Sequence, residues 1–213
     1  RHINTRKTTL NNSLEVKNPK VEKAPDKYKE QSITENKIYY ADYDSIQNDI
    51  MILSKEGKFT LETLPYSMVY STLYSEGLSS IPFQKLREGK ALAYSAYSYI
   101  KSPDKRDNSF YLISYIGTQS DKTDDAISSF KGLLDNFVVT EGQFNEAKEL
   151  ILKNIENQRI IKDDVYQAYL GNKRLGLKDD PRKYVYSKVK SMTYEEFKTF
   201  FEQNISNQKY NMI

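Results

Sequence analysis

The spacing of apolar residues changes along this chain, and this change limits the possible folds more than any other feature. From residue 37 to 117 the apolar residues fall mainly in short β-prone runs around one helical segment, and beyond them they recur every three to four residues. Strands followed by helices, rather than alternating regularly with them, are typical of the α+β class. We therefore expect a mostly antiparallel sheet with helices packed on one face.

Individual segments follow from this pattern and from the turn-forming residues between them. Strands are expected over residues 37–43, 49–53, 91–100, 109–117 and 208–213. Helices are expected over residues 60–74, 82–89, 126–137 and 144–155. Thr140 to Gln143 and Thr193 to Glu196 have the form of capping boxes, in which a threonine and a Gln or Glu three residues later begin a helix.

The start of the chain differs in character from the rest. Residues 1–36 are polar and are broken by Pro19 and Pro25, so we interpret them as an N-terminal arm or interdomain linker that precedes one domain over 37–213. Residues 1–30 hold eight Lys or Arg and four Asp or Glu, which could attract nucleic acid. The cations are scattered rather than clustered, so we expect no nucleic-acid partner.

Neither a membrane span nor an export signal is expected from the sequence. No stretch approaches the ~18 consecutive apolar residues that a spanning helix needs. The first ten residues, RHINTRKTTL, also lack the apolar segment of a signal peptide. These observations predict a globular domain.

Composition excludes several kinds of catalytic site. The chain has no cysteine and one histidine, His2, which has no second histidine or carboxylate at helical spacing, so a zinc site is not expected. The Gly-Lys pairs lack the context of a phosphate-binding loop, and Gly77 to Ile81 lacks the second glycine of a serine-hydrolase turn. The residues alone therefore predict an α+β domain with no metal, no cofactor and no catalytic site of its own.

One segment carries a more specific signal. Residues 77–95 read GLSSIPFQKLREGKALAYS, in which a Gly-x-x-Ser turn leads to Phe83, Arg87 follows four residues later within Leu-Arg-Glu, and Tyr94 follows seven residues after that. This spacing resembles the signature of the zinc-free half of pitrilysin/insulinase-type peptidases. Weaker landmarks extend the resemblance over about residues 47–205. The chain departs from the family at Ile81-Pro82, where Arg-Leu is usual, and at Ala91, where Gly is usual.

The resemblance implies a metallohydrolase-like half of a two-domain zinc peptidase. Its partner would be a homologous half that carries an inverted His-x-x-Glu-His zinc motif, either in the same chain or as a separate subunit. In this interpretation Arg87 and Tyr94 reach the peptide substrate and donate hydrogen bonds to its carbonyl or to the oxyanion. Phe83 is the third substrate-binding residue, which mainly packs and turns one side to the substrate. The implied function is a substrate-positioning, zinc-free half of a metalloendopeptidase, and this chain alone is expected to be inactive.

Two other interpretations stay open at this point. The chain could be an inactive structural or assembly module of the same fold, and without the resemblance Arg87 would be read as a surface cation and Tyr94 as a packed strand residue. Together with an Asn-, Lys- and Tyr-rich composition of bacterial character, the resemblance favours the periplasm as the compartment.

Overall fold

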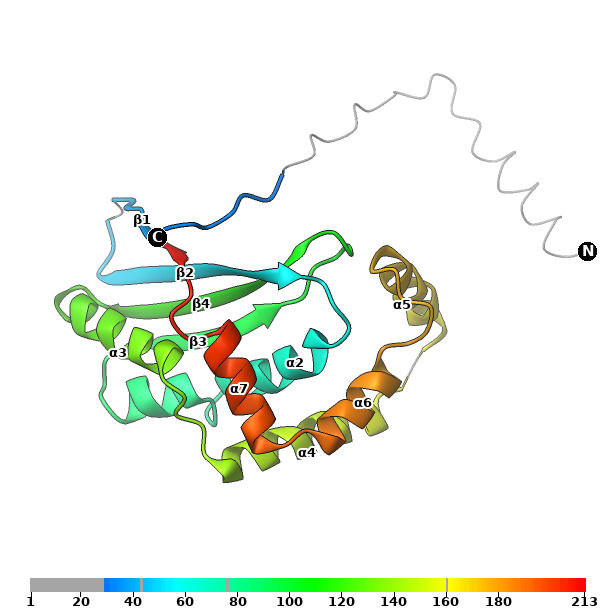
Figure 1. Cartoon of the computed structure of the whole chain (residues 1–213). Helices are drawn as coiled ribbons and strands as arrows, with labels where there is room; N and C mark the ends of the chain where they lie inside the picture. Colours follow the sequence, from blue (N-terminus) through cyan, green and yellow to red (C-terminus); the bar gives the residue numbers. More distant parts are fainter. Residues whose placement is uncertain (1–28, 43, 76, 160) are drawn as a thin grey trace, which may run out of the picture. The chain divides into compact units, whose positions relative to one another are not determined.

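The computed structural model describes residues 29–42, 44–75, 77–159 and 161–213 (Figure 1). Residues Ser32–Ile213 form one compact unit, and Arg1–Gln31 form a second, of which the structure describes residues 29–31. Most of the expected N-terminal arm, including His2, lies outside the described residues. The domain boundary at residue 36 therefore stays a prediction.

The larger unit is built on a five-stranded sheet with the order β1-β5-β2-β4-β3. The strands are β1 (Lys37–Ile38), β2 (Gln47–Lys58), β3 (Ser95–Lys101), β4 (Ser109–Gln119) and β5 (Tyr210–Met212). The pairs β3–β4, β4–β2 and β2–β5 are antiparallel, and β1 pairs with β5 in parallel. The long β2–β4 ladder therefore forms the centre of the sheet, and β3 forms one edge.

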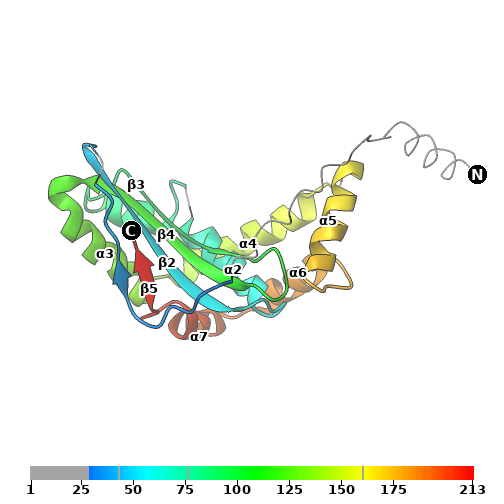
Figure 2. The ribbon, with the colours of Figure 1, turned by 90° about the horizontal axis from the view of Figure 1, so that it is seen from above.

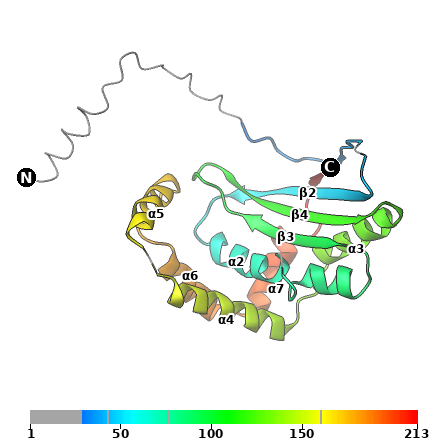
Figure 3. The ribbon, with the colours of Figure 1, turned by 180° about the vertical axis from the view of Figure 1, so that it is seen from behind.

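The helices are short to medium in length. They are α2 (Thr63–Tyr74), the π-helix η1 (Phe83–Glu88), the 3₁₀ turn η2 (Ser120–Lys122), α3 (Thr123–Asp135), α4 (Glu141–Asn157), α5 (Lys162–Arg174), α6 (Arg182–Ser191) and α7 (Tyr194–Asn204). Figures 1 and 3 show α2, α3 and α7 beneath the sheet, with α4 and α6 farther from it. Among the described helices none covers the opposite face. The expected α+β fold, with helices on one face of a mostly antiparallel sheet, is confirmed.

Alternation along the strands explains this arrangement. In β3 and β4 buried and half-buried residues alternate, as expected when one face of a sheet packs on helices. Toward the helices, Tyr70, Phe144 and Phe201 belong to one core cluster, and Ile116 and Phe130 belong to a second. Burial of these apolar side chains supplies the main driving force for the fold.

The opposite face of the sheet, which is turned toward the viewer in Figure 2, also carries apolar residues. This open face is defined by residues of β2, β3 and β4, namely Met51, Leu53, Tyr97, Tyr99, Tyr111, Ile113 and Tyr115. Tyr97 stacks on Tyr115 with ring centroids 5.1 Å apart, and the Tyr115 hydroxyl donates to Asp49 at 2.6 Å. Burial, followed by the hydrogen bond to Asp49, raises the pKa of Tyr115 to about 12.

The structure differs from the sequence-based expectation at strand ends. β2 continues to Lys58 rather than ending at Leu53, and β1 has two residues rather than seven. β3 begins at Ser95 rather than Ala91, because Ala91 has a φ of 50° and lies in the left-handed region, where an extended strand cannot continue.

Candidate functional site

Arg87 lies on η1, a short helix whose ends are fixed by local hydrogen bonds. At its start the Ser80 carbonyl accepts from the Gln84 amide at 3.0 Å, and at its end the Ala91 amide donates to the Arg87 carbonyl at 3.0 Å. Leu86 is buried in the core, so its neighbour Arg87 points away from the core and is exposed. The sequence therefore anchors the helix through Leu86 and leaves the guanidinium group accessible.

Phe83 contacts the Arg87 side chain but is less exposed than Arg87. It is half-buried, and the guanidinium carbon of Arg87 lies 4.9 Å from the centroid of the Phe83 ring. A guanidinium over an aromatic face at this distance is a cation–π contact. Phe83 therefore limits the positions that the Arg87 side chain can take.

Tyr94 lies immediately before β3 and is 51% exposed. Its amide donates to the Gly117 carbonyl at 2.9 Å, which attaches this end of the segment to β4. Its hydroxyl oxygen accepts a hydrogen bond from Gln119 Nε2 at 2.8 Å. Because the amide group of Gln119 acts as the donor, the hydroxyl hydrogen of Tyr94 stays available for another acceptor.

The structure brings Arg87 and Tyr94 together at one cavity of about 250 Å³. The segment Ala91 to Ala93 forms part of its wall, and Gln119 and Lys122 complete the lining. Phe83 does not line this cavity. Two of the three residues singled out from the sequence therefore meet at one site, and the third lies behind one of them.

Sequence reasoning missed Gln119 and Lys122. They lie at the end of β4 and in η2, more than twenty residues from Tyr94 in the chain. Nothing in their local spacing marks them, because their proximity to Tyr94 depends on the β3–β4 pairing that joins Ser95 to Gly117. A correct register for that hairpin would have indicated Gln119.

Comparison with known protein families identifies the family of this chain. Residues 7–151 match the family model described as the peptidase M16 inactive domain. The chain belongs to this family. The match confirms the resemblance to the zinc-free part of pitrilysin-type peptidases. A search of curated protein sequences found no match.

Solved structures show the same fold at low sequence identity. The M16 inactive domain of Pseudomonas fluorescens has a TM-score of 0.71 and 14% identity over 84% of this chain and 43% of that one. A protease from Helicobacter pylori has a TM-score of 0.71 and 12% identity over 100% of this chain and 51% of that one. Pitrilysin has a TM-score of 0.56 and 10% identity over 84% of this chain and 19% of that one. The chain thus spans about half or less of each of these proteins.

Metal ligands are not found within the part of this M16 domain that the structure describes. No group of three or more His, Cys, Asp or Glu side chains is placed there to hold a metal ion. The described helices also include none that is long and apolar enough to cross a membrane. The described residues alone therefore do not form a site that fits a zinc ion.

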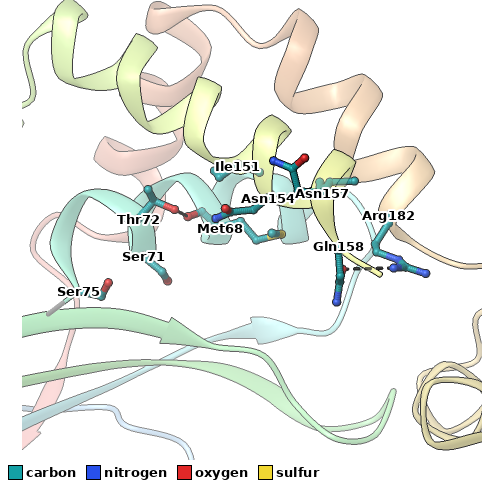
Figure 4. A pocket seen from close by; sticks show the side chains of 10 residues that line it. Met68, Ser71, Thr72, Ser75, Ile151, Asn154, Asn157, Gln158 and Arg182 are labelled. Carbon is teal, nitrogen blue, oxygen red and sulfur yellow. Dashed lines mark hydrogen bonds between the residues drawn. The ribbon is translucent and has the colours of Figure 1, made fainter. Parts of the chain in front are cut away.

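A larger cavity, of about 680 Å³, lies between α2 and α4 of the M16 domain (Figure 4). Some of its polar side chains are already engaged. Arg182 donates to Gln158 at 3.2 Å and pairs with Asp180, and Thr72 donates to the carbonyl of Met68 at 2.8 Å. The one cation in its lining, Arg182, is therefore neutralised by an ion pair, unlike the cations of the cavity at Arg87.

Glu56 is an ionisable residue on the helix-packed face of the sheet, remote in sequence from the Arg87 cavity. Among the described residues its Oε1 atom is buried without a hydrogen-bond partner. Burial raises the pKa of Glu56 to about 7, from an ordinary value of 4.5. A carboxylate in this position is unfavourable because water is removed without replacement by a donor.

Proposed function

We propose that this chain is the substrate-positioning, zinc-free half of a zinc metalloendopeptidase that acts on peptides. The observation that carries the proposal is that Arg87 and Tyr94 line one cavity. Both present donors, since a guanidinium is permanently charged and the Tyr94 hydroxyl hydrogen is not used by Gln119. Such donors suit a peptide carbonyl, and they suit even better the negative charge that develops on its oxygen during hydrolysis.

The position of Tyr94 also fits the binding of an extended peptide. Tyr94 lies at the start of β3, which is an edge strand of the sheet. At the other end of β3 the Ile100 amide donates to the Ser71 hydroxyl at 3.1 Å. A peptide that pairs with this edge would therefore do so beside Tyr94, where main-chain hydrogen bonds would tolerate many sequences.

Zinc and the nucleophile would come from a homologous partner half, in the same full-length chain or as a separate subunit. Two apolar surfaces support the need for such a partner. The open face of the sheet includes Met51, which is 43% exposed. Helix α5 exposes a second apolar stripe, formed by Ile161, Val165, Tyr166 and Tyr169. Exposed apolar surfaces of this kind are typical of protein–protein contacts.

The same two surfaces favour a second candidate, an inactive structural or assembly module of the same fold. The two functions differ in one outcome. Both predict that the chain binds a homologous zinc-bearing subunit, but the peptidase function also predicts that the mixture hydrolyses unstructured peptides that neither part hydrolyses alone. Stable association of the two parts without peptide hydrolysis would support the assembly module and contradict our proposal.

A further inference from the structure

The cavity at Arg87 and Tyr94 has an unusual balance of charge. Two cationic side chains, Arg87 and Lys122, line it, and no acidic side chain does. The acidic residues nearest to them in sequence, Glu88 and Asp121, are exposed and do not belong to the lining. Among the described residues neither cation forms an ion pair with a carboxylate.

Lys122 is held at the cavity by its own contacts. It is half-buried at the N-cap of α3, and its Nζ atom donates to the Ala91 carbonyl at 3.3 Å. Ala91 also lines the cavity, and the next residue, Leu92, accepts a hydrogen bond from Thr118 at 2.6 Å. An ammonium group has three donors, so the bond to Ala91 leaves two of them for a ligand.

The remaining polar groups of the cavity also act mainly as donors. Within the described part of the chain the Arg87 guanidinium makes its cation–π contact with Phe83 and has no hydrogen-bond partner. Gln119 gives a hydrogen to Tyr94, whose own hydroxyl hydrogen is then available. A ligand group that meets the free donors of Arg87, Tyr94 and Lys122 must be an acceptor. The two cations favour an acceptor that is negatively charged.

We propose that this cavity selects peptides that carry a carboxylate, and that Lys122 is the specificity-determining residue. The inference rests on the proposed function, because it treats the cavity as a contact site for peptide substrate. Arg87 and Tyr94 would hold the peptide whatever its sequence, whereas Lys122 would add affinity when an acidic side chain or a free C-terminal carboxylate lies beside it.

Three peptides of otherwise identical sequence test the inference. The parent has an internal Gln and an amidated C-terminus, the second has Glu in place of that Gln, and the third has a free C-terminus. Their dissociation constants are measured by NMR titration of this chain, alone and with its partner depleted of zinc so that the peptides stay intact. At low ionic strength at least one carboxylate peptide should bind about fivefold more tightly than the parent. This preference should decrease toward 1 M salt because the charges are screened.

Two variants separate Lys122 from general charge effects. Lys122→Gln should remove the preference, so that the two carboxylate peptides bind no more tightly than the parent peptide. Lys153→Gln, which removes the same charge from an exposed site on α4, should keep the preference. Equal affinities for all three peptides, no binding of any peptide, or a preference that persists in Lys122→Gln would overturn the inference. Hydrolysis of the parent peptide by the assembled pair tests the proposed function separately, because that peptide has no carboxylate at these positions.

Discussion

Arg87 and Tyr94 are separated by a helix end and a turn, yet both line one cavity. The reversal occurs at Ala91, whose φ of 50° directs the chain from η1 back toward β4. A left-handed conformation costs a residue with a side chain about 1–2 kcal/mol, whereas glycine adopts it readily. This explains why glycine is usual in the family at the position of Ala91.

Ala91→Gly should therefore stabilise the domain by up to about 1 kcal/mol, because it removes the backbone strain. The greater entropy of the unfolded chain offsets part of this gain. Ala93→Gly is the matched control. Ala93 is buried and does not have a positive φ, so its replacement should destabilise the domain by about 1 kcal/mol. Urea unfolding of both variants measures the two effects, and a destabilised Ala91→Gly variant would refute the account of strain.

The raised pKa of Glu56 should make the free energy of unfolding decrease as the pH rises. Its pKa is about 7 in the folded chain and close to 4.5 when unfolded, so the folded state holds the proton more tightly. The stability that this proton provides is complete below about pH 4.5 and is lost as the pH rises through about 7. Glu56→Gln should be neutral near pH 4.5 and stabilising by about 2 kcal/mol at pH 8.

Unfolding free energies at several pH values test this prediction. Glu149→Gln, on the exposed surface of α4, serves as the control and should follow the wild type. If the difference between Glu56→Gln and the wild type were the same at pH 5 and pH 8, Glu56 would not titrate as its burial implies.

Of the residues that line the cavity, only those within one continuous segment could be predicted from the sequence. Arg87 and Tyr94 could be identified because their spacing to Phe83 lies within one continuous segment. Gln119 and Lys122 could not be, because their place beside Tyr94 is created by strand pairing. The same is true of Glu56, which interacts with Tyr70 of α2 only because the fold brings these two elements together.

Among the helices and strands, the starts that the sequence predicted correctly were those marked by local hydrogen-bonding motifs. Both expected capping boxes are present, with reciprocal hydrogen bonds at Thr140 and Thr193. The segments that were misjudged depend on partners. β2 continues to Lys58 because β4 pairs with it that far, although Gly57 interrupts its pattern. β1 consists of two residues paired with the C-terminal strand, which no local pattern could indicate.

The capping box of α7 provides a test at this scale. The Thr193 hydroxyl accepts from the Glu196 amide at 3.2 Å, and α7 inserts Phe197 and Phe201 into the core. Thr193→Ala should destabilise the domain by about 1 kcal/mol. Thr199→Ala, within the exposed part of the same helix, should change stability by less than about 0.5 kcal/mol. Thermal unfolding distinguishes the cap from the general effect of losing a threonine, and equal losses would contradict the assigned role.

At the scale of the whole molecule, the open face should be the contact with the partner half. Met51 lies opposite Tyr115 on this face, so Met51→Glu places a charge among apolar side chains without disturbing the core. The variant should fold but lose most of its affinity for the partner, because the contact would bury an unpaired charge. Ile46→Glu, at a position that is 93% exposed outside the strands, is the control. Unchanged association of Met51→Glu in analytical ultracentrifugation would exclude the open face as the contact.

This domain should supply Arg87 and Tyr94 to a peptide held at the partner's zinc site. The most direct test is kcat/KM of the assembled pair on an unstructured peptide. Arg87→Ala and Tyr94→Phe should each lower it about 100-fold, since a donor aimed at developing charge contributes about 3 kcal/mol. Lys85→Ala and Tyr186→Phe, which do not line the cavity, should retain wild-type activity. Full activity of both Arg87→Ala and Tyr94→Phe in a correctly assembled pair would contradict the account.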